Sequence, residues 1–411
     1  KTILRVGRQG TDVIWEPFNR EHDGRFATSR NLYKSLLGNK LCFEEVNHDL
    51  ALAFRYTWAT SDRHGFVRLC ELENFGDETL QVELVDGLQN ILPAGTPLLV
   101  QTNASNLVDA YKWTELDSAT GLAMYTLYSG ISDRAEPSES LRANVVYGLG
   151  LDAPTVLLSS LQLDPFRLGR TVVQEDRKRG IRGAYFLSSS LVLSGREARR
   201  WQIIADVGRT QGQVRELILQ LAAPADAALA VTRSVAAGCD ELARIMAAAD
   251  GLQSTAEESV TAHHYANVLF NVLRGGIFHD QYRVSVADFA GNVRHFNAGV
   301  HARHRDLLAS LPGTLAAEDL LAAVRRTGDA QLERLCYEYL PITFGRRHGD
   351  PSRPWNRFTI RLKDARGEPL LSYEGNWRDI FQNWEALACS YPEFVESMIF
   401  TFLNATTVDG Y

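Results

Sequence analysis

The first half of the chain alternates apolar and polar residues in short runs. Phe54, Tyr56 and Trp58 alternate with Arg55 and Thr57, which places three aromatic side chains on one face of an expected strand. The same period-two alternation recurs at 80–84, 122–128, 191–193 and 201–207. Turn signals separate these runs, among them Asp86-Gly87, Pro93-Ala94-Gly95 and Asp164-Pro165. Residues 1 to about 210 therefore predict a large antiparallel β-sandwich of many short strands.

The hydrophobic period changes after residue 210. Val214, Leu217, Ile218 and Leu221 fall at i, i+3, i+4 and i+7, the apolar stripe of an amphipathic helix. A second helical pattern runs from Pro224 to a stop at Asp250-Gly251 and is rich in alanine, which favours helix. Further helical patterns lie at 255–273, 315–326, 329–339, 376–389 and 392–403. The second half is predicted to be α-helical.

Composition and charge limit the classes of protein that this chain could represent. With 45% hydrophobic and 23% charged residues, the chain can offset its ordering entropy by burial, which excludes intrinsic disorder. An uncharged apolar run of the ~20 residues that a bilayer requires is absent, so we expect no membrane span. The net charge of −7 argues against a nucleic-acid partner. The short basic run Arg177-Lys178-Arg179 is interpreted as a solvated hairpin loop.

The cysteines indicate neither a disulfide framework nor a zinc site. They are odd in number and widely spread, at Cys42, Cys70, Cys239, Cys336 and Cys389. Ligand spacings such as CxxC do not occur among them. A reducing, cytoplasmic location is expected.

The densest group of polar and aromatic residues lies at 373–385. If this segment is helical from about Asn376, then Asp379, Gln382 and Asn383 share one face, with Trp377 on a neighbouring stripe. Carboxylate, amide and guanidinium groups match sugar hydroxyls, and tryptophan stacks on the C–H face of a sugar ring. The alternative, which composition alone favours, is an Arg378–Asp379 network that locks a helix end, with the tryptophans in the core.

A loop rich in arginine, histidine and tryptophan precedes this segment, at 344–357. Its Gly- and Pro-broken sequence includes Trp355 and Arg357, and its arginines could gather an anion such as phosphate. A surface loop held by salt bridges is the other interpretation.

Histidines at His295, His301 and His304 have no acidic residue at a recognised metal spacing. We therefore interpret these histidines as packed or capped, and expect no metal site.

The segment Trp377-Arg378-Asp379-Ile380-Phe381-Gln382 resembles the aromatic-Arg-Asp-x-x-Gln segment of the cellobiose and chitobiose phosphorylases, glycoside hydrolase family 94. The order of the chain is similar as well. Stretches such as Ser61-Asp62 and Gly65-Phe66-Val67-Arg68 look like parts of that family's N-terminal domain.

This resemblance implies a β + α multidomain fold in three parts. It implies an antiparallel β-supersandwich over 1–210, a helical linker over 211–254, and the N-terminal part of an (α/α)6 barrel over 255–411. It further implies that Arg378 and Asp379 bind sugar hydroxyls, with Gln382 in support. Trp377, Trp355 and Arg357 complete the set of predicted substrate-binding residues.

Two departures from the family pattern affect what the chain can do. The family usually has a sugar-binding Arg six residues before the Arg-Asp arginine, where this chain has Ser372. The general acid of the family lies in an Asp-Trp-Asn-Asp-like motif that these 411 residues lack. About 155 residues follow position 255, too few for twelve helices with their connections. We therefore expect the sequence to be an N-terminal portion of a longer polypeptide, with its general acid elsewhere.

The function that the resemblance implies is an inverting glycoside phosphorylase acting on β-linked glucosides or oligosaccharides. Inorganic phosphate would be the co-substrate, without a metal or organic cofactor, and a homodimer is expected. One alternative is an inverting glycoside hydrolase on the same scaffold. The other is a non-catalytic carbohydrate-binding or assembly protein, if the chain ends at Tyr411.

Overall fold

The computed structural model describes most of the chain. The described residues are 1–8, 10–131, 140–273, 277–278, 283–339, 342–343, 364, 385, 388–389, 392 and 394–410. They divide into two compact units, Lys1–Cys239 and Asp240–Tyr411, each of which is treated separately below. The division falls within one helix, whereas the sequence predicts domain limits after residues 210 and 254. Those domain limits stay predictions.

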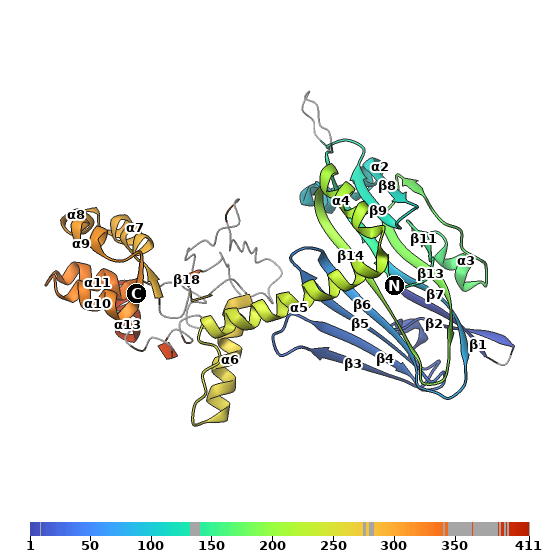
Figure 1. The fold of residues 1–411 in the computed structure, drawn as a ribbon, viewed down its shortest axis with the longest axis horizontal. Coiled ribbons are helices and arrows are strands. Elements are labelled where there is room, and N and C mark those ends of the chain that lie inside the picture. The colour runs from blue at the N-terminus through green and yellow to red at the C-terminus, as the bar shows by residue number, and fades with distance from the viewer. Residues whose placement is uncertain are drawn as a thin grey trace. The chain divides into compact units, whose positions relative to one another are not determined.

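Within the described part of Lys1–Cys239, strands form two antiparallel sheets (Figure 1). The larger sheet has nine strands in the order β12(Arg177–Arg179), β8(Lys112–Asp117), β9(Leu122–Leu127), β10(Arg142–Leu149), β14(Ala198–Thr210), β6(Gly65–Asn74), β5(Leu52–Ser61), β4(Leu41–Asn47) and β3(Thr28–Lys34). The smaller has five strands in the order β11(Thr155–Leu157), β13(Gly183–Leu193), β7(Leu80–Ile91), β1(Thr2–Arg8) and β2(Thr11–Trp15). The predicted β-rich first half is confirmed.

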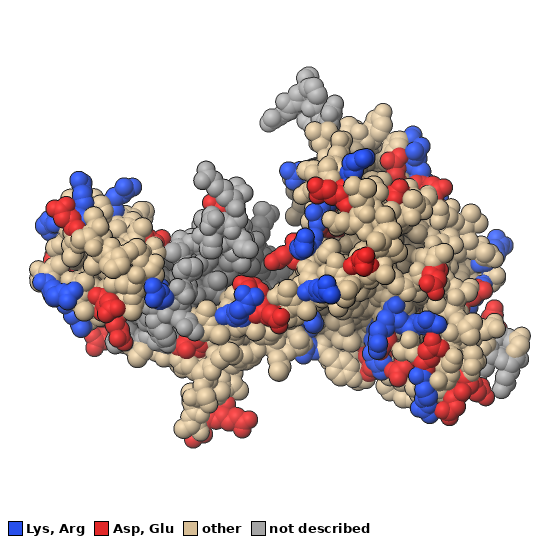
Figure 2. Space-filling model, in the orientation of Figure 1, with Lys and Arg blue, Asp and Glu red and all other residues tan. Residues whose placement is uncertain are grey.

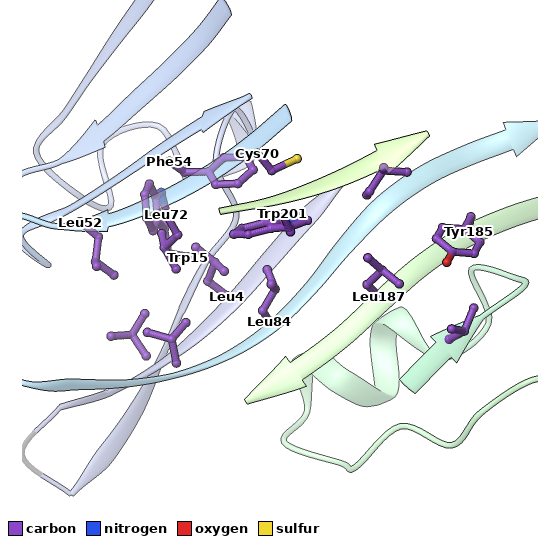
Figure 3. Close-up of a cluster of buried hydrophobic side chains, with 14 of the residues drawn as sticks. Leu4, Trp15, Leu52, Phe54, Cys70, Leu72, Leu84, Tyr185, Leu187 and Trp201 are labelled. Carbon is purple, nitrogen blue, oxygen red and sulfur yellow. The ribbon is translucent and has the colours of Figure 1, made fainter. Parts of the chain in front are cut away.

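A hydrophobic core joins the two sheets. Trp201 and Phe54 come from the nine-stranded sheet, and Leu84, Leu187 and Trp15 come from the five-stranded sheet. Figure 3 shows these side chains pointing toward one another from the two layers. All five are fully or almost fully buried. Phe54, Leu84 and Trp201 belong to the alternating runs of the sequence, which mark the inward face at these positions. Tyr128 and Val207, at the ends of two other such stretches, are exposed instead.

The outer face of the nine-stranded sheet is covered at one end by helices. α4(Gln211–Leu221) begins directly after β14, and α5(Pro224–Ala248) follows it. Val214 and Leu221 of α4 and Val231 of α5 pack against Val145 and Ile204 of the sheet. The predicted apolar stripe of α4 is therefore the stripe that faces the strands.

Short helices complete the first unit. They are a 3-10 helix at Arg20–His22, α1(Leu98–Asn103), α2(Ser105–Tyr111) and α3(Leu163–Arg167). α3 occupies the position of the predicted Asp164-Pro165 turn, because proline is well tolerated in the first turn of a helix.

Two expectations for this unit are wrong. Asp86-Gly87 is not a turn but the middle of β7, where Asp86 is buried and a side chain at Gly87 would collide with the carbonyl of Tyr185. Arg177 and Arg179 are exposed as expected, but they belong to the edge strand β12 and not to a loop.

The second unit is mainly helical in its described residues. Its elements are α6(Glu258–Leu273), β15(Ile277–Phe278), β16(Arg283–Ser285), α7(Val286–Phe296), α8(Ala298–Arg303), α9(Arg305–Ser310), β17(Thr314–Ala316), α10(Ala317–Arg325), α11(Ala330–Glu338), β18(Ile342–Thr343) and α13(Phe394–Asn404). Phe289, Val293, Leu320, Val324 and Leu332 form the centre of a separate core built from α7, α10 and α11.

The described chain is thus a combination of antiparallel β-sheets and helices, as predicted at the level of fold class. The finer expectation of a supersandwich followed by (α/α)6-barrel helices stays a prediction. Among the described helices, none combines the length and the apolar character needed to cross a bilayer.

Candidate functional site

The predicted substrate-binding residues cannot be placed from this structure. Arg378, Asp379, Gln382, Trp377, Trp355 and Arg357 all lie outside the described residues. One neighbour in the same predicted helix, Glu385, is described. Its carboxylate lies 2.7 Å from His263 Nε2 and accepts a hydrogen bond of 3.1 Å from Asn267 Nδ2. Glu385 itself therefore contacts α6.

The histidines that the sequence singles out have ordinary partners where these are described. His304 Nε2 lies 2.8 Å from Asp329 Oδ2, and Arg303 Nη2 donates to the same oxygen at 3.0 Å. The other oxygen of Asp329 caps the start of α11 by accepting from the backbone N–H of Gln331. Within the described residues, His, Cys, Asp and Glu side chains do not gather in a group of three or more that could hold a metal ion.

The first unit contains a cavity of about 620 Å³ with mostly polar walls. We call it the polar pocket. Its walls come from the β5–β6 hairpin, β10, the end of β14, α4 and the first turns of α5. The lining residues are Asp62, Arg63, His64, Tyr147, Asp206, Arg209, Gln213, Glu216, Leu217, Leu219, Gln220, Leu221, Ala223, Asp226, Ala227 and Ala230.

The hairpin at one side of the polar pocket is held in a fixed conformation. Ser61 Oγ accepts hydrogen bonds from the backbone N–H groups of Arg63 and His64, at 3.3 and 3.1 Å. The same oxygen lies 2.7 Å from Ser234 Oγ of α5. Gly65 has φ +74°, and a Cβ there would lie 2.7 Å from the carbonyl oxygen of Ala205. Only glycine fits this tight approach between the hairpin and β14.

His64 projects from this hairpin as a neutral imidazole. Its Nδ1 lies 3.2 Å from the Tyr147 hydroxyl. Burial lowers the pKa of His64, and the nearby guanidinium groups of Arg63 and Arg209 lower it further. Burial also raises the pKa of Tyr147, so the tyrosine keeps its proton. The pair can therefore exchange hydrogen bonds with a ligand but carries no charge near neutral pH.

The guanidinium group of Arg209 is held in place by Asp206 and by the carbonyl oxygen of Arg63. Its Nε donates to Asp206 Oδ2 at 2.5 Å, and its Nη2 donates to the carbonyl oxygen of Arg63 at 2.7 Å. Asp206 also accepts from the backbone N–H of Val207 at 2.7 Å. The charges of this pair largely neutralise one another, and the guanidinium is held in one orientation.

The opposite wall is a polar stripe of α4. Gln213, Glu216 and Gln220 lie at i, i+3 and i+7, so they share one face of the helix. Gln213 also forms a capping box with Thr210, in which its Oε1 accepts from the Thr210 N–H at 2.9 Å. The helix thus turns its apolar stripe to the sheet and a hydrogen-bonding stripe to the cavity.

Sequence reasoning did not identify the polar pocket. The available signal was a charged hairpin, Asp62-Arg63-His64, between two apolar strands, together with Asp206 on the outer face of β14. Neither signal shows that a helix will close over these residues. The pocket depends on the path of the chain after Thr210.

Charged side chains of both signs are interspersed on the face of the first unit shown in Figure 2. A basic stripe of the kind that follows a nucleic-acid backbone is not seen on that face. Hydrogen bonding, rather than a strong field of one sign, is what this surface offers to a ligand.

Comparison with protein-family models finds a match to a class of carbohydrate-active proteins. Residues 278–341 match the model described as glycoside hydrolase family 149 insertion domain 1. This range contains the separate core of α7, α10 and α11. The match supports a protein of glycoside hydrolase or phosphorylase type, and not family 94 specifically. A comparison with curated proteins gives no match.

Two solved structures are similar over much of the chain. A bacterial glucoamylase complexed with acarbose has 9% identity and a TM-score of 0.40, and the similarity covers 83% of this chain and 51% of the glucoamylase. A human-microbiome protein assigned as a kojibiose phosphorylase has 10% identity and a TM-score of 0.35, with 82% and 41% covered. The chain thus spans about half the length of the first and less of the second.

Proposed function

We propose that this chain forms part of a carbohydrate-active enzyme of the inverting glycoside-phosphorylase type, acting on β-linked glucosides or oligosaccharides. The observation that carries the proposal is the match of residues 278–341 to an insertion domain of a glycoside hydrolase family. The segment Trp377-Arg378-Asp379-Ile380-Phe381-Gln382 supports the proposal from the sequence, since its groups suit sugar hydroxyls and sugar rings.

In this proposal a carboxylic acid protonates the glycosidic oxygen while phosphate attacks the anomeric carbon from the opposite face. The bond between the anomeric carbon and the leaving oxygen breaks, the leaving sugar takes the proton, and a sugar 1-phosphate of inverted configuration forms. Phosphate replaces the water and the base carboxylate of an inverting hydrolase. Arg378 and Asp379 would hold the sugar hydroxyls next to the cleaved bond, with Gln382, Trp377, Trp355 and Arg357 as further contacts.

The type of reaction is tested with the native full-length protein and β-linked glucose disaccharides, with and without inorganic phosphate. A phosphorylase releases sugar 1-phosphate only when phosphate is present. Equal rates of sugar release in its absence would favour an inverting hydrolase instead. A protein that binds these sugars and cleaves none under either condition would be a carbohydrate-binding or assembly protein.

The proposed sugar contacts are tested by Asp379→Ala and Arg378→Ala in the full-length protein. Loss of a charged hydrogen bond to substrate costs ~1–3 kcal/mol, so each change should weaken substrate binding roughly fivefold or more. Asp319→Ala is the matched control, because Asp319 is an exposed carboxylate of α10. If Asp379→Ala binds substrate as the control does, the sugar-contact role is wrong. If it fails to fold, the alternative is favoured, in which Arg378 and Asp379 lock a helix end.

A further inference from the structure

The polar pocket has the features of a preformed ligand site. Its volume of about 620 Å³ lies in the ~300–1,000 Å³ range of small-molecule sites. Ser61 fixes the hairpin that carries His64, and Asp206 together with the Arg63 carbonyl fixes Arg209. A ligand that enters would therefore meet side chains that have already lost much of their rotamer freedom, which lowers the entropic cost of binding.

The opposite wall offers hydrogen-bonding capacity that the protein does not use. Glu216 and Gln220 are exposed, and within the described part of the chain neither side chain makes a hydrogen bond or an ion pair. Gln213 uses Oε1 in the capping box, which leaves the two protons of its amide nitrogen. Carboxylate and amide groups at this helical spacing can accept from and donate to neighbouring hydroxyls.

The charges of the lining disfavour an anionic ligand. Four acidic residues line the pocket against two arginines, and Asp206 and Arg209 neutralise one another. The remaining Asp62, Glu216 and Asp226 outnumber Arg63. Phosphate and other anions would be repelled, whereas neutral hydroxyl groups can bond with carboxylates, amides, imidazole and guanidinium alike.

We propose that the polar pocket binds a short neutral oligosaccharide. The choice of a sugar among neutral hydroxyl-rich ligands rests on the proposed function. The site itself is built entirely from Lys1–Cys239, without Arg378 or Asp379. Leu219 lines the pocket and is exposed, so it supplies an apolar surface for the C–H groups of a sugar ring, and the hairpin, Arg209 and the α4 stripe offer partners to the hydroxyls.

The test uses isothermal titration calorimetry without phosphate on the full-length protein carrying Asp379→Ala, which should weaken sugar binding at the proposed Arg378–Asp379 site. The probes are cellotriose and laminaritriose, two neutral β-linked glucose trisaccharides. Ala230 is an exposed residue of α5 that lines the pocket, so Ala230→Trp should obstruct part of the cavity and leave the fold unchanged. Ala237 is two helical turns further along the same face, is exposed and does not line the pocket, which makes Ala237→Trp the matched control.

We expect at least a tenfold weaker trisaccharide affinity in Ala230→Trp and no change in Ala237→Trp. Glu216→Ala and Gln220→Ala should each weaken binding by about threefold to tenfold, the loss of one or two hydrogen bonds to ligand. These two exposed changes keep the test decisive even if the tryptophan variant folds poorly.

Other outcomes would overturn the proposal. Equal affinities in the two tryptophan variants would show that the pocket is not the binding site. Binding of spermidine but of neither trisaccharide, abolished by Ala230→Trp, would assign the pocket to a cationic ligand instead.

The same measurements separate this proposal from the proposed function. If the native protein cleaves no glycoside but binds the trisaccharides in a way that Ala230→Trp weakens, the proposed function is wrong and the polar pocket is still an oligosaccharide site. If the native protein cleaves glycosides but Ala230→Trp does not change trisaccharide affinity, the proposed function holds and the polar pocket is not an oligosaccharide site.

Discussion

Arg68 and Asp86 form a buried ion pair between the two sheets of the first unit. Arg68 Nη1 donates to both carboxylate oxygens of Asp86, at 2.9 and 2.7 Å, and Trp201 Nε1 donates to the same carboxylate at 2.8 Å. Burial alone would raise the pKa of Asp86, but the guanidinium and the hydrogen bonds outweigh burial and hold that pKa below its usual range. The carboxylate is thus kept charged within the core.

Removing one partner of this pair should be far more harmful than removing both. Asp86→Ala leaves a buried guanidinium unpaired, so we expect a loss of ~3–5 kcal/mol in the free energy of unfolding of the first unit. The double change Arg68→Met with Asp86→Leu should recover most of that loss. Urea unfolding measures both. If the double variant is as unstable as Asp86→Ala, the attraction between Arg68 and Asp86 determines the stability of the first unit, and the unpaired buried charge does not.

Glu16 gives the first unit a dependence on pH. The side chain of Glu16 is buried, and it accepts hydrogen bonds from Arg167 Nε at 2.5 Å and Nη2 at 3.1 Å. Burial opposes ionisation, but the hydrogen bonds from Arg167 and Lys1 are stronger and lower the pKa from 4.5 to about 2. Since the folded pKa is the lower one, this stabilisation is complete above pH 4.5 and is lost as the pH falls toward 2.

We expect the free energy of unfolding of Glu16→Gln to depend less on pH in this range than that of the native protein. Between pH 5 and pH 2 the native protein should lose ~1–2 kcal/mol that the variant does not lose, after allowance for solvent screening of the partly exposed arginine. Chemical unfolding at a series of pH values provides the comparison. If the free energies of unfolding of the native protein and of Glu16→Gln fall equally with pH, Glu16 is not the source of the pH dependence.

Asp86-Gly87 shows why residue-level signals can mislead. In isolation the dipeptide favours a turn. In the structure it lies mid-strand, because Arg68 on another sheet neutralises the aspartate and the backbone of β13 comes too close for any side chain at Gly87. Both causes are tertiary contacts, separated from the dipeptide by many residues, so local pattern could not reveal them.

At the scale of elements, the start of α4 links the sheet to the polar pocket. Thr210 Oγ1 accepts from the Gln213 N–H at 3.4 Å, and the Gln213 side chain accepts in return from the Thr210 N–H. This capping box satisfies two backbone donors where β14 ends and the helix begins. It also fixes the first residue of the stripe that faces the cavity.

Thr210→Ala should remove the cap and destabilise the first unit by ~1 kcal/mol. Thr210→Ser keeps the hydroxyl and should restore most of that stability. Thermal or urea unfolding of the full chain tests the pair of variants. If the serine variant is no more stable than the alanine variant, the hydroxyl does not act as a cap.

Helix and strand periodicity predicted elements better than it predicted sites. The stripe of Val214, Leu217, Ile218 and Leu221 gave α4, and the stop at Asp250-Gly251 follows the end of α5. The basic run at 177–179 became an edge strand because its backbone pairs with β8 and Arg179 packs over the Trp113 ring, 3.5 Å from its centroid. The order of the strands in a sheet depends on the topology of the chain, and hydrophobic periodicity alone does not predict that order.

At the scale of the whole molecule, the described residues form two units with separate cores. The first core lies between two sheets, and the second is formed by α7, α10 and α11 within the range that matches the insertion-domain model. We therefore expect each unit to respond to its own core mutations.

Phe289 lies at the centre of the second core, fully buried and edge-on to Tyr339. Phe289→Ala should destabilise the second unit by ~3–5 kcal/mol and leave the transition of the first unit in place. Phe296→Ala, in the same helix but with 68% of its surface exposed, is the control and should change stability by less than ~0.5 kcal/mol. Calorimetry of the full chain measures the thermal unfolding transition of each unit. If Phe289→Ala shifts one common transition for the whole chain, the two cores do not unfold independently.

The sequence allowed the fold class, the change from strands to helices near residue 210 and the carbohydrate-related class of function to be predicted. It did not reveal the polar pocket, because that cavity brings together residues from the β5–β6 hairpin and from helices about 150 residues later. The predicted contacts of Arg378 and Asp379 stay predictions, since those residues lie outside the described part of the chain.

Proton NMR of a β-linked glucose oligosaccharide, incubated with the native full-length protein and inorganic phosphate, tests the central claim most directly. The account predicts that the β-linkage is cleaved and that the first product is the α-anomer of the sugar 1-phosphate, since phosphate attacks from the face opposite the leaving group. A β-configured sugar phosphate, or oligosaccharides that remain intact across the β-linkages tested, would contradict it.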